Sequence, residues 1–426
     1  MTQPQLHSRL STLLERGPSE SVWQHIVAVF DTVRDTGVEK EIVRFLEPRL
    51  DRWPDGLRRA PGHWWAALQD GESPRPAWSL VRSLVVPNPH DDLLCPDILA
   101  AITDLALHPS TTEHDWTIVS QLVGLQSLRA SRVASLTDCE PLVKLTRLGW
   151  LDLKNCPELR DVTGLGGLGA LRFLNLSGCY RVPSLTGLEH LPVEKLIVTG
   201  CDGVADFAPL ASLEQLGHLE VGGENLISLD VLGDRPGLAQ LKIAGCPGLT
   251  DLTALAPRPG LIELNLSACK ALENLSALSG LPDLTRLTLH DLARVDDLSG
   301  LTGLTELTVL SLSNLPRCQA LCVPRRAVHL EQLRLTRLAR LTDLSALSAL
   351  PALRQVTLAF CTSVANLDPL ARLDGLEVLD LRGNRQLDDI SPLLGLPRLR
   401  AVNLHGCTGI RNADLLAQKP GVTLTR

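Results

Sequence analysis

Aliphatic residues recur along this chain at an almost constant spacing. We call the recurring positions anchors, and eleven of the fourteen intervals between them are 23 residues long. The anchors are Leu84, Leu105, Leu128, Leu151, Leu174, Leu196, Leu219, Leu241, Leu264, Leu287, Leu310, Leu333, Val356, Leu379 and Val402. A second aliphatic residue follows each anchor after two positions, with Ala130 as the only small exception. Alternation with a period of two predicts a short β-strand at each anchor, with one face directed inward.

The residues after each predicted strand continue the pattern at a wider spacing. Apolar residues fall about eight, eleven and fourteen positions after the anchor, as in residues 151–168 and 241–257. Asp, Asn, Thr, Gly and Pro separate them, which favours tight turns and short 3₁₀ segments. One strand and one return path cannot bury their leucines alone, so neighbouring units must stack. We therefore expect an α/β solenoid with a parallel sheet of about 15 strands, curved into an arc with the sheet on its concave surface.

Six-residue motifs within the units resemble a known repeat family. LNLSGC (174–179), LNLSAC (264–269) and VNLHGC (402–407) are similar to the cysteine-containing class of leucine-rich repeats. TDLSAL (342–347) and DDISPL (388–393) are similar to the internalin-like class. The chain thus resembles a leucine-rich-repeat protein of bacterial type, intermediate between these two classes. The resemblance implies the arc-shaped fold but says little about function, because one fold carries many functions.

The resemblance covers residues 76–426, which we predict to form one solenoid. Degenerate units over 76–121 have the pattern of a capping end, and regular units follow over 122–412. Residues 420–426 have the pattern of a terminal strand that closes the other end. Repeat arrays need such ends, because an uncovered terminal repeat would expose its apolar core.

Residues 1–75 precede the predicted array and differ from it in composition. They contain four of the seven tryptophans, although only 3% of the whole chain is aromatic. Leu6, Leu10, Leu13 and Leu14 have helical spacing, so we predict a small helical N-terminal domain. Two roles stay open for it: a cap over the apolar end of the solenoid, or a signalling or effector module that the repeats regulate.

The composition limits the classes of partner. The net charge is -7 and the isoelectric point is about 5.9, so there is no basic excess to neutralise a phosphate backbone. No stretch approaches the roughly 18 apolar residues of a membrane span, and the N-terminus lacks the continuous apolar core of a signal peptide. We therefore expect a cytoplasmic protein that binds neither nucleic acid nor a membrane.

Cysteines occupy one position of the unit, five residues after the anchor. The column consists of Cys156, Cys179, Cys201, Cys246, Cys269, Cys361 and Cys407, with Asn384 once. A thiol is a weak donor that fits an apolar interior, so we interpret these residues as buried structural thiols. Cys318, Cys322 and His329 could in principle hold a metal, but their spacing fits no strong zinc pattern. We favour a buried free thiol at Cys318 and predict no metal site.

Residues 164–169, GLGGLG, match the dinucleotide-binding pattern in letters alone. That pattern needs a preceding strand and a following helix, whereas Leu165 and Leu168 continue the apolar columns of their unit. The eleven histidines are scattered, and none stands in a recognisable pairing with both a nucleophile and an acid. We therefore predict no catalytic residues, no cofactor and no enzymatic activity.

The residues that flank each anchor point away from the core, onto the predicted concave face. Trp150 and Phe173 occupy one column on adjacent strands, with Ile197 close by. Aromatic residues are common contact residues in binding sites. A cover by the N-terminal domain or simple mutual stacking of the two rings would explain them equally well. The candidate partner-binding residues are Trp150, Asp152, Lys154, Phe173, Ile197, His218, Glu220, Arg286, His290, Arg334, Arg337, Phe360, Asp380 and Arg382.

These observations predict a non-enzymatic scaffold that binds a protein partner through the concave face of the solenoid. The alternative is a target-selecting or sensor subunit whose N-terminal helical module is an effector or signalling domain. Carbohydrate binding in the concavity is disfavoured, because aromatic platforms are not spaced along the predicted face.

Overall fold

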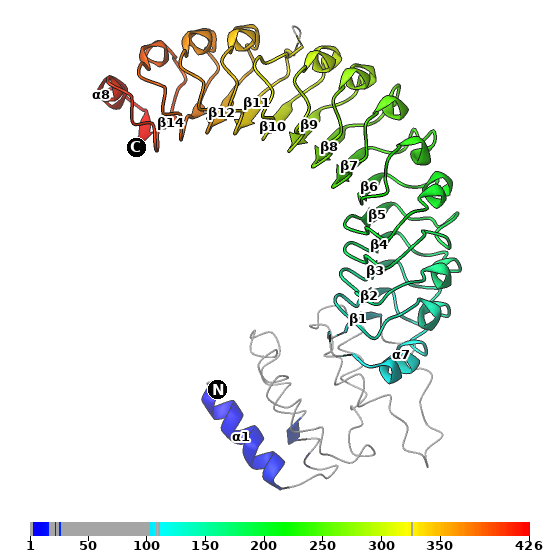
Figure 1. Cartoon of the computed structure of the whole chain (residues 1–426). Helices are drawn as coiled ribbons and strands as arrows, with labels where there is room; N and C mark the ends of the chain where they lie inside the picture. The colour runs from blue at the N-terminus through cyan, green and yellow to red at the C-terminus, as the bar shows by residue number, and fades with distance from the viewer. Residues whose placement is uncertain are drawn as a thin grey trace. The chain divides into compact units, whose positions relative to one another are not determined.

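One parallel sheet organises the described part of the chain. The computed structural model describes residues 3–16, 22, 25–26, 103–107, 109, 111–324 and 327–426. Fifteen strands of these residues form an open, all-parallel sheet and follow one another in chain order, as predicted (Figure 1). The strands are β1 (Asp104–Ala106), β2 (Ser127–Arg129), β3 (Trp150–Asp152), β4 (Phe173–Asn175), β5 (Lys195–Val198), β6 (His218–Val221), β7 (Gln240–Ala244), β8 (Glu263–Ser267), β9 (Arg286–His290), β10 (Val309–Ser313), β11 (Gln332–Thr336), β12 (Gln355–Ala359), β13 (Val378–Asp380), β14 (Ala401–Asn403) and β15 (Thr423–Thr425).

The anchors set the register of this sheet. Leu128 pairs with Leu151, and Leu264 pairs with Leu287, so equivalent residues of consecutive repeats lie side by side. The anchors from Leu105 to Val402 are at most 2% exposed. Their side chains form the core together with the second aliphatic of each strand, and the flanking residues project from the other side of the sheet. We call that other side the strand face.

Short helices complete the described elements. The α-helices are α1 (Gln3–Glu15), α7 (Glu113–Val119) and α8 (Ala413–Ala417), and no helix among the described residues is long and apolar enough to cross a membrane. The return paths contain the predicted 3₁₀ segments. These are η2 (Glu140–Leu142), η3 (Thr163–Leu165), η4 (Ala208–Ser212), η5 (Asp230–Leu232), η6 (Thr253–Leu255), η7 (Ser276–Gly280), η8 (Ser299–Gly303), η9 (Ser345–Ala349), η10 (Asp368–Arg372) and η11 (Ser391–Leu393).

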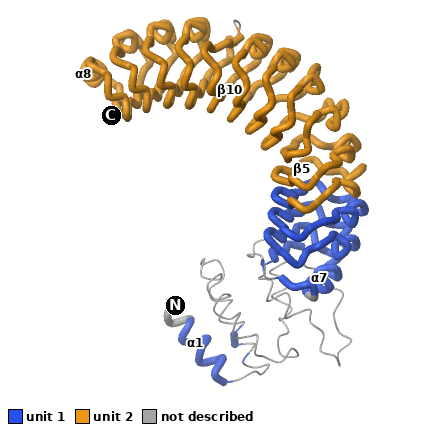
Figure 2. The backbone as a smooth tube through the Cα atoms, in the orientation of Figure 1, with its two compact units in different colours: residues 1–179 blue, residues 180–426 orange. Residues whose placement is uncertain are grey.

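The chain divides into two compact units, residues 1–179 (unit 1) and 180–426 (unit 2) (Figure 2). Within unit 2, the strands line the inner side of a curve and the 3₁₀ helices its outer side. In unit 1, α1 lies where the leucine spacing predicts a helix. The anchor Leu84 and most of residues 1–75 lie outside the described residues, so the role of the N-terminal segment stays a prediction.

A column of short polar side chains precedes most of the 3₁₀ helices. We call it the turn column, and its residues lie ten positions after the anchor. A carboxylate oxygen of Asp251 accepts the backbone N–H of Thr253 at 2.8 Å, and Asn274 accepts that of Ser276 at 2.7 Å. The column comprises Asp138, Asp161, Ser184, Asp206, Asp251, Asn274, Asp297, Asp343, Asn366 and Asp389, whereas Leu229 and Ala320 hold this position in two further repeats. The methyl group of Ala320 cannot accept a hydrogen bond, and the described part of the segment between β10 and β11 contains no 3₁₀ helix.

The carboxylates of the turn column should make the array sensitive to acid. Hydroxyl and backbone hydrogen bonds from Thr253 and Ser299 hold the pKa of Asp251 and Asp297 below the ordinary value of 3.8. A carboxyl group whose pKa is lowered by folding stabilises the folded state at pH values above its pKa in the unfolded chain. This stabilisation is lost as the pH falls through the pKa of the folded state. We expect the Asp251→Asn/Asp297→Asn variant, which keeps the acceptor oxygens, to lose less stability than the wild type between pH 7 and pH ~3. Urea unfolding at both pH values measures the difference, and equal losses would contradict the assignment.

Candidate functional site

Two aromatic rings stack on the strand face of unit 1. Trp150 at the start of β3 is in register with Phe173 at the start of β4, because both residues directly precede an anchor. Their ring centroids are 4.8 Å apart and their planes differ by 4°. The guanidinium of Arg129 lies over the Trp150 ring, 5.3 Å from its centroid. Trp150 and Phe173 are in register, whereas Arg129 is in register with Asp152 and its long side chain reaches the Trp150 ring from the neighbouring strand. We call these three residues the aromatic row.

The aromatic row is a half-buried apolar surface on a face that packing of the core does not use. Both rings remain partly accessible, and the anchors behind them are fully buried. An oxygen of Asp152 accepts the N–H of Lys154 at 3.0 Å, so an acidic group is held beside the rings while Lys154 extends into solvent. The sequence indicated the pair of rings but not Arg129. Its signal was its place one residue after an anchor on the neighbouring strand.

A hydrogen-bonded polar cluster lies on β6 and β7 in unit 2. Lys242 Nζ is 3.0 Å from one carboxylate oxygen of Glu220, and His218 Nε2 is 3.3 Å from the other. Burial raises the pKa of Glu220, but the bonds from Lys242 and His218 outweigh burial and hold it below its ordinary value. Ile197 of β5 is in register with Glu220 and half-buried. The sequence predicted His218 and Glu220 here, whereas Lys242 was missed.

The predicted basic residues on β9 and β11 do not form one group. The guanidinium of Arg286 pairs with Glu263 at 3.2 Å, and that of Arg334 donates to Gln332 at 3.0 Å. Strand β10, which carries Val309, Ser311 and Ser313 on this face, separates β9 from β11. His290 and Arg337 are exposed at the ends of these strands. This part of the face is therefore mixed in charge rather than positive.

Phe360 is held in an unusual conformation after β12. Its φ of 57° lies in the left-handed region, which is costly for a bulky side chain. The ring is 45% exposed and lies over Gly383 of the next repeat, where an added Cβ would come within 2.3 Å of a ring carbon. Near it, Arg382 pairs with Asp380 at 3.1 Å. The glycine at 383 is thus needed for the position of the ring.

Comparison with known proteins identifies the architecture. No family model matches the chain. Its structure is similar to the crystal structure of an internalin from Listeria monocytogenes, with a TM-score of 0.56 and 20% identity over 81% of this chain and 92% of that one. The chain has the leucine-rich-repeat fold. The predicted resemblance is therefore confirmed at the level of the fold.

Two curated proteins of Arabidopsis thaliana match shorter stretches of this leucine-rich-repeat chain. Disease resistance protein RPP2A is 31% identical over 120 residues, and disease resistance protein RRS1 is 35% identical over 86 residues. The matched stretches are 27% and 20% of this chain but only 9% and 6% of those proteins. The matches are too short to define the activity or partner of this chain.

The cysteines five residues after the anchors are buried free thiols, as predicted, except that Cys407 is only partly buried. The sulfur of Cys179 donates to the carbonyl of Leu153 at 3.1 Å, a partner 26 residues earlier in the preceding repeat. Asn384 donates to Leu358 across the same sequence separation. Burial raises the pKa of Cys361 to about 11, so its thiolate is not available at neutral pH. No group of three metal-binding side chains lies within the described residues.

Two buried arginines were missed by sequence reasoning. Arg235 and Arg258 lie six residues before their anchors, where other leucine-rich repeats of the chain carry Leu281 or Leu304, and each is 6% exposed. Arg235 donates to the carbonyl of Leu213 at 3.1 Å, and Arg258 donates to two further carbonyls. Burial lowers the pKa of both guanidinium groups. The signal in the sequence was the break in a leucine column at two consecutive repeats.

Proposed function

We propose that this chain is a non-enzymatic scaffold that binds a protein partner through the strand face, with the aromatic row of Arg129, Trp150 and Phe173 as the principal contact. Stacked rings present a large rigid apolar area at low entropic cost, and aromatic and arginine side chains are the commonest centres of binding energy. The acidic Asp152 and the exposed Lys154 would supply the polar rim. The stacked pair, partly accessible and not part of the core, carries the proposal.

The charge of the molecule supports a protein partner over a nucleic acid. The net charge of -7 opposes a polyanion. In unit 2 the strand face carries basic and acidic side chains that form ion pairs, such as Arg286 with Glu263 and Arg382 with Asp380. Such a surface suits a polar protein epitope, because paired charges select complementary partners more than they add affinity.

Removal of the aromatic row should weaken partner binding without unfolding the repeats. The full chain, its Trp150→Ala/Phe173→Ala variant and an Ile227→Ala control serve as baits in lysate of the native cell. Ile227 is 64% exposed and lies on a return path, away from the strand face. Proteins retained by the wild type and the control, but reduced at least tenfold on the double variant, are the candidate partners, since hot-spot residues contribute about 2 kcal/mol or more each.

Binding of each purified candidate to the wild type, the double variant and the Ile227→Ala control then tests the proposed contact. We expect Trp150→Phe to retain most of the affinity, because a flat ring stays in the row. Circular dichroism and urea unfolding check that the double variant is folded. If no protein depends on the two rings while the variant is folded, the proposed contact is wrong.

A further inference from the structure

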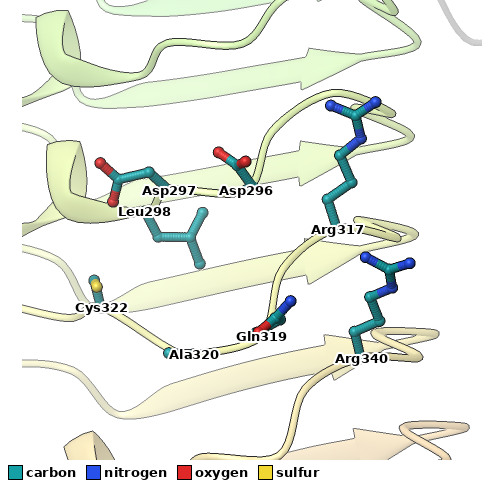
Figure 3. Close-up of a pocket in the computed structure, with 8 residues that line it drawn as sticks. All are labelled: Asp296, Asp297, Leu298, Arg317, Gln319, Ala320, Cys322 and Arg340. Carbon is teal, nitrogen blue, oxygen red and sulfur yellow. The ribbon is translucent and has the colours of Figure 1, made fainter.

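An open pocket lies in unit 2 where the repeat pattern is interrupted. It has a volume of about 560 Å³ and lies beside the segment that follows β10 (Figure 3). Its lining residues are Asp296, Asp297, Leu298, Arg317, Gln319, Ala320, Cys322 and Arg340. This volume lies in the range of sites that hold small ligands or a few residues of a peptide.

The pocket lies where the turn column is interrupted at Ala320. In the neighbouring repeats, Asp297 accepts the N–H of Ser299 at 2.7 Å and Asp343 accepts that of Ser345 at 2.8 Å, and a 3₁₀ helix begins at each serine. Ala320 is bridged in parallel to Asp343 but provides no acceptor. The exposed Ala320 and the partly buried Cys322 form a floor that no 3₁₀ turn of the described residues covers, whereas Leu298 beside them is fully buried.

The two arginines at one end of the pocket are equivalent residues of consecutive repeats. Arg317 and Arg340 each lie seven positions after an anchor, and both are exposed. Neither makes an ion pair or a side-chain hydrogen bond with another described residue, whereas Arg294, the equivalent residue one repeat earlier, pairs with Glu273 at 3.0 Å. Figure 3 shows both guanidinium groups at the same end of the pocket, with Asp297 and Cys322 at the other. Two adjacent unpaired guanidinium groups are suited to one carboxylate, which arginine binds with paired hydrogen bonds.

The two aspartates of the pocket differ in the hydrogen bonds that they accept. Asp297 is engaged by the N–H and hydroxyl of Ser299 at 2.7 and 2.6 Å. Asp296 is exposed and accepts no hydrogen bond from any other described residue. Burial and the nearby Asp297 raise the pKa of Cys322, so its thiol is not activated as a nucleophile. The pocket is therefore suited to binding a ligand rather than to thiol chemistry.

We propose that this pocket binds an extended segment of a protein that carries an acidic side chain. Arg317 and Arg340 hold the carboxylate, Asp296 accepts an N–H of the segment, and the exposed Ala320 contacts a small apolar side chain. A nucleic acid fits poorly, because Asp296 and Asp297 would face its phosphates. This site is separate from the aromatic row, and its existence does not depend on the function proposed above.

Peptide arrays test the proposal on the full chain. One array holds octapeptides with a central glutamate and varied flanks, and a matched array carries glutamine at that position. We expect glutamate-dependent binding that decreases at least about tenfold in the Arg317→Ala/Arg340→Ala variant, because both charged donors are removed. The Arg294→Ala control should bind as the wild type does. The Trp150→Ala/Phe173→Ala variant should also bind normally, so failure here is distinguishable from failure of the strand-face proposal.

Charge reversal gives a sharper outcome. The Arg317→Glu/Arg340→Glu variant should lose the glutamate peptides and gain peptides with a central lysine, since the same geometry then presents carboxylates. Circular dichroism of each variant checks folding. The proposal is overturned if glutamate and glutamine peptides bind equally, if the double alanine variant retains binding, or if a short oligonucleotide binds in place of the peptides.

Discussion

Replacing Leu287 by alanine should lower the free energy of unfolding of the repeat array by about 2–5 kcal/mol. Leu287 is the anchor of β9, is 0% exposed and pairs in register with Leu264 and Leu310 of the neighbouring strands. The substitution removes apolar area from the core and leaves a cavity between two neighbouring repeats. Because few aromatic side chains are present to fill such a space, collapse of the cavity should be limited and the cost should lie near the upper end.

The same strand offers a matched control. Thr288 follows Leu287 and projects from the strand face, so Thr288→Ala should change stability by less than about 1 kcal/mol. Urea unfolding measures both variants, and hydrogen exchange locates the effect. We expect faster exchange in β8, β9 and β10 in the leucine variant, because repeats interact mainly with their neighbours. Equal unfolding midpoints for the two variants would show that the anchor column does not carry the stability.

The regular spacing explains why so much of the fold could be predicted. A residue such as Leu151 constrains its own strand, and the equal interval to Leu174 constrains the register of the next strand. The period therefore predicted the strands, their parallel order and the place of Trp150 and Phe173 in one column on adjacent strands. Each of these conclusions needs only the spacing along the chain and the alternation of side chains across a strand.

Contacts between repeats were harder to predict, because they depend on side-chain direction. The position of Arg129 over Trp150 and the bond from Lys242 to Glu220 both join different strands through long flexible side chains. Spacing alone cannot show whether an arginine such as Arg286 is free or paired with Glu263. The pocket at Ala320 was missed for a related reason. The absence of an acceptor at this position can be recognised in the sequence only when the role of the turn column is already known.

The buried arginines lead to a prediction of the opposite sign. Replacing both Arg235 and Arg258 by leucine should raise the free energy of unfolding by about 1–4 kcal/mol, the range found when buried charged groups give way to packed apolar residues. Nη2 of Arg235 and both Nε and Nη1 of Arg258 are buried without a hydrogen-bond partner. Burial and the charge of Arg258 lower the pKa of Arg235, and burial lowers that of Arg258 although Asp234 opposes it.

Leucine already fills this position in other repeats, so the backbone there accommodates it. The range of about 1–4 kcal/mol is a net value, so it already includes the loss of the hydrogen bonds to the carbonyls of Leu213, Gly233 and Ala254. The Arg235→Ala/Arg258→Ala variant separates the two effects, because it removes the charges but leaves cavities. We expect the stability order leucine variant, wild type, alanine variant in urea unfolding at pH 7. A leucine variant less stable than the wild type would mean that the carbonyl bonds outweigh the desolvation of the guanidinium groups, and that the two arginines stabilise this part of the array.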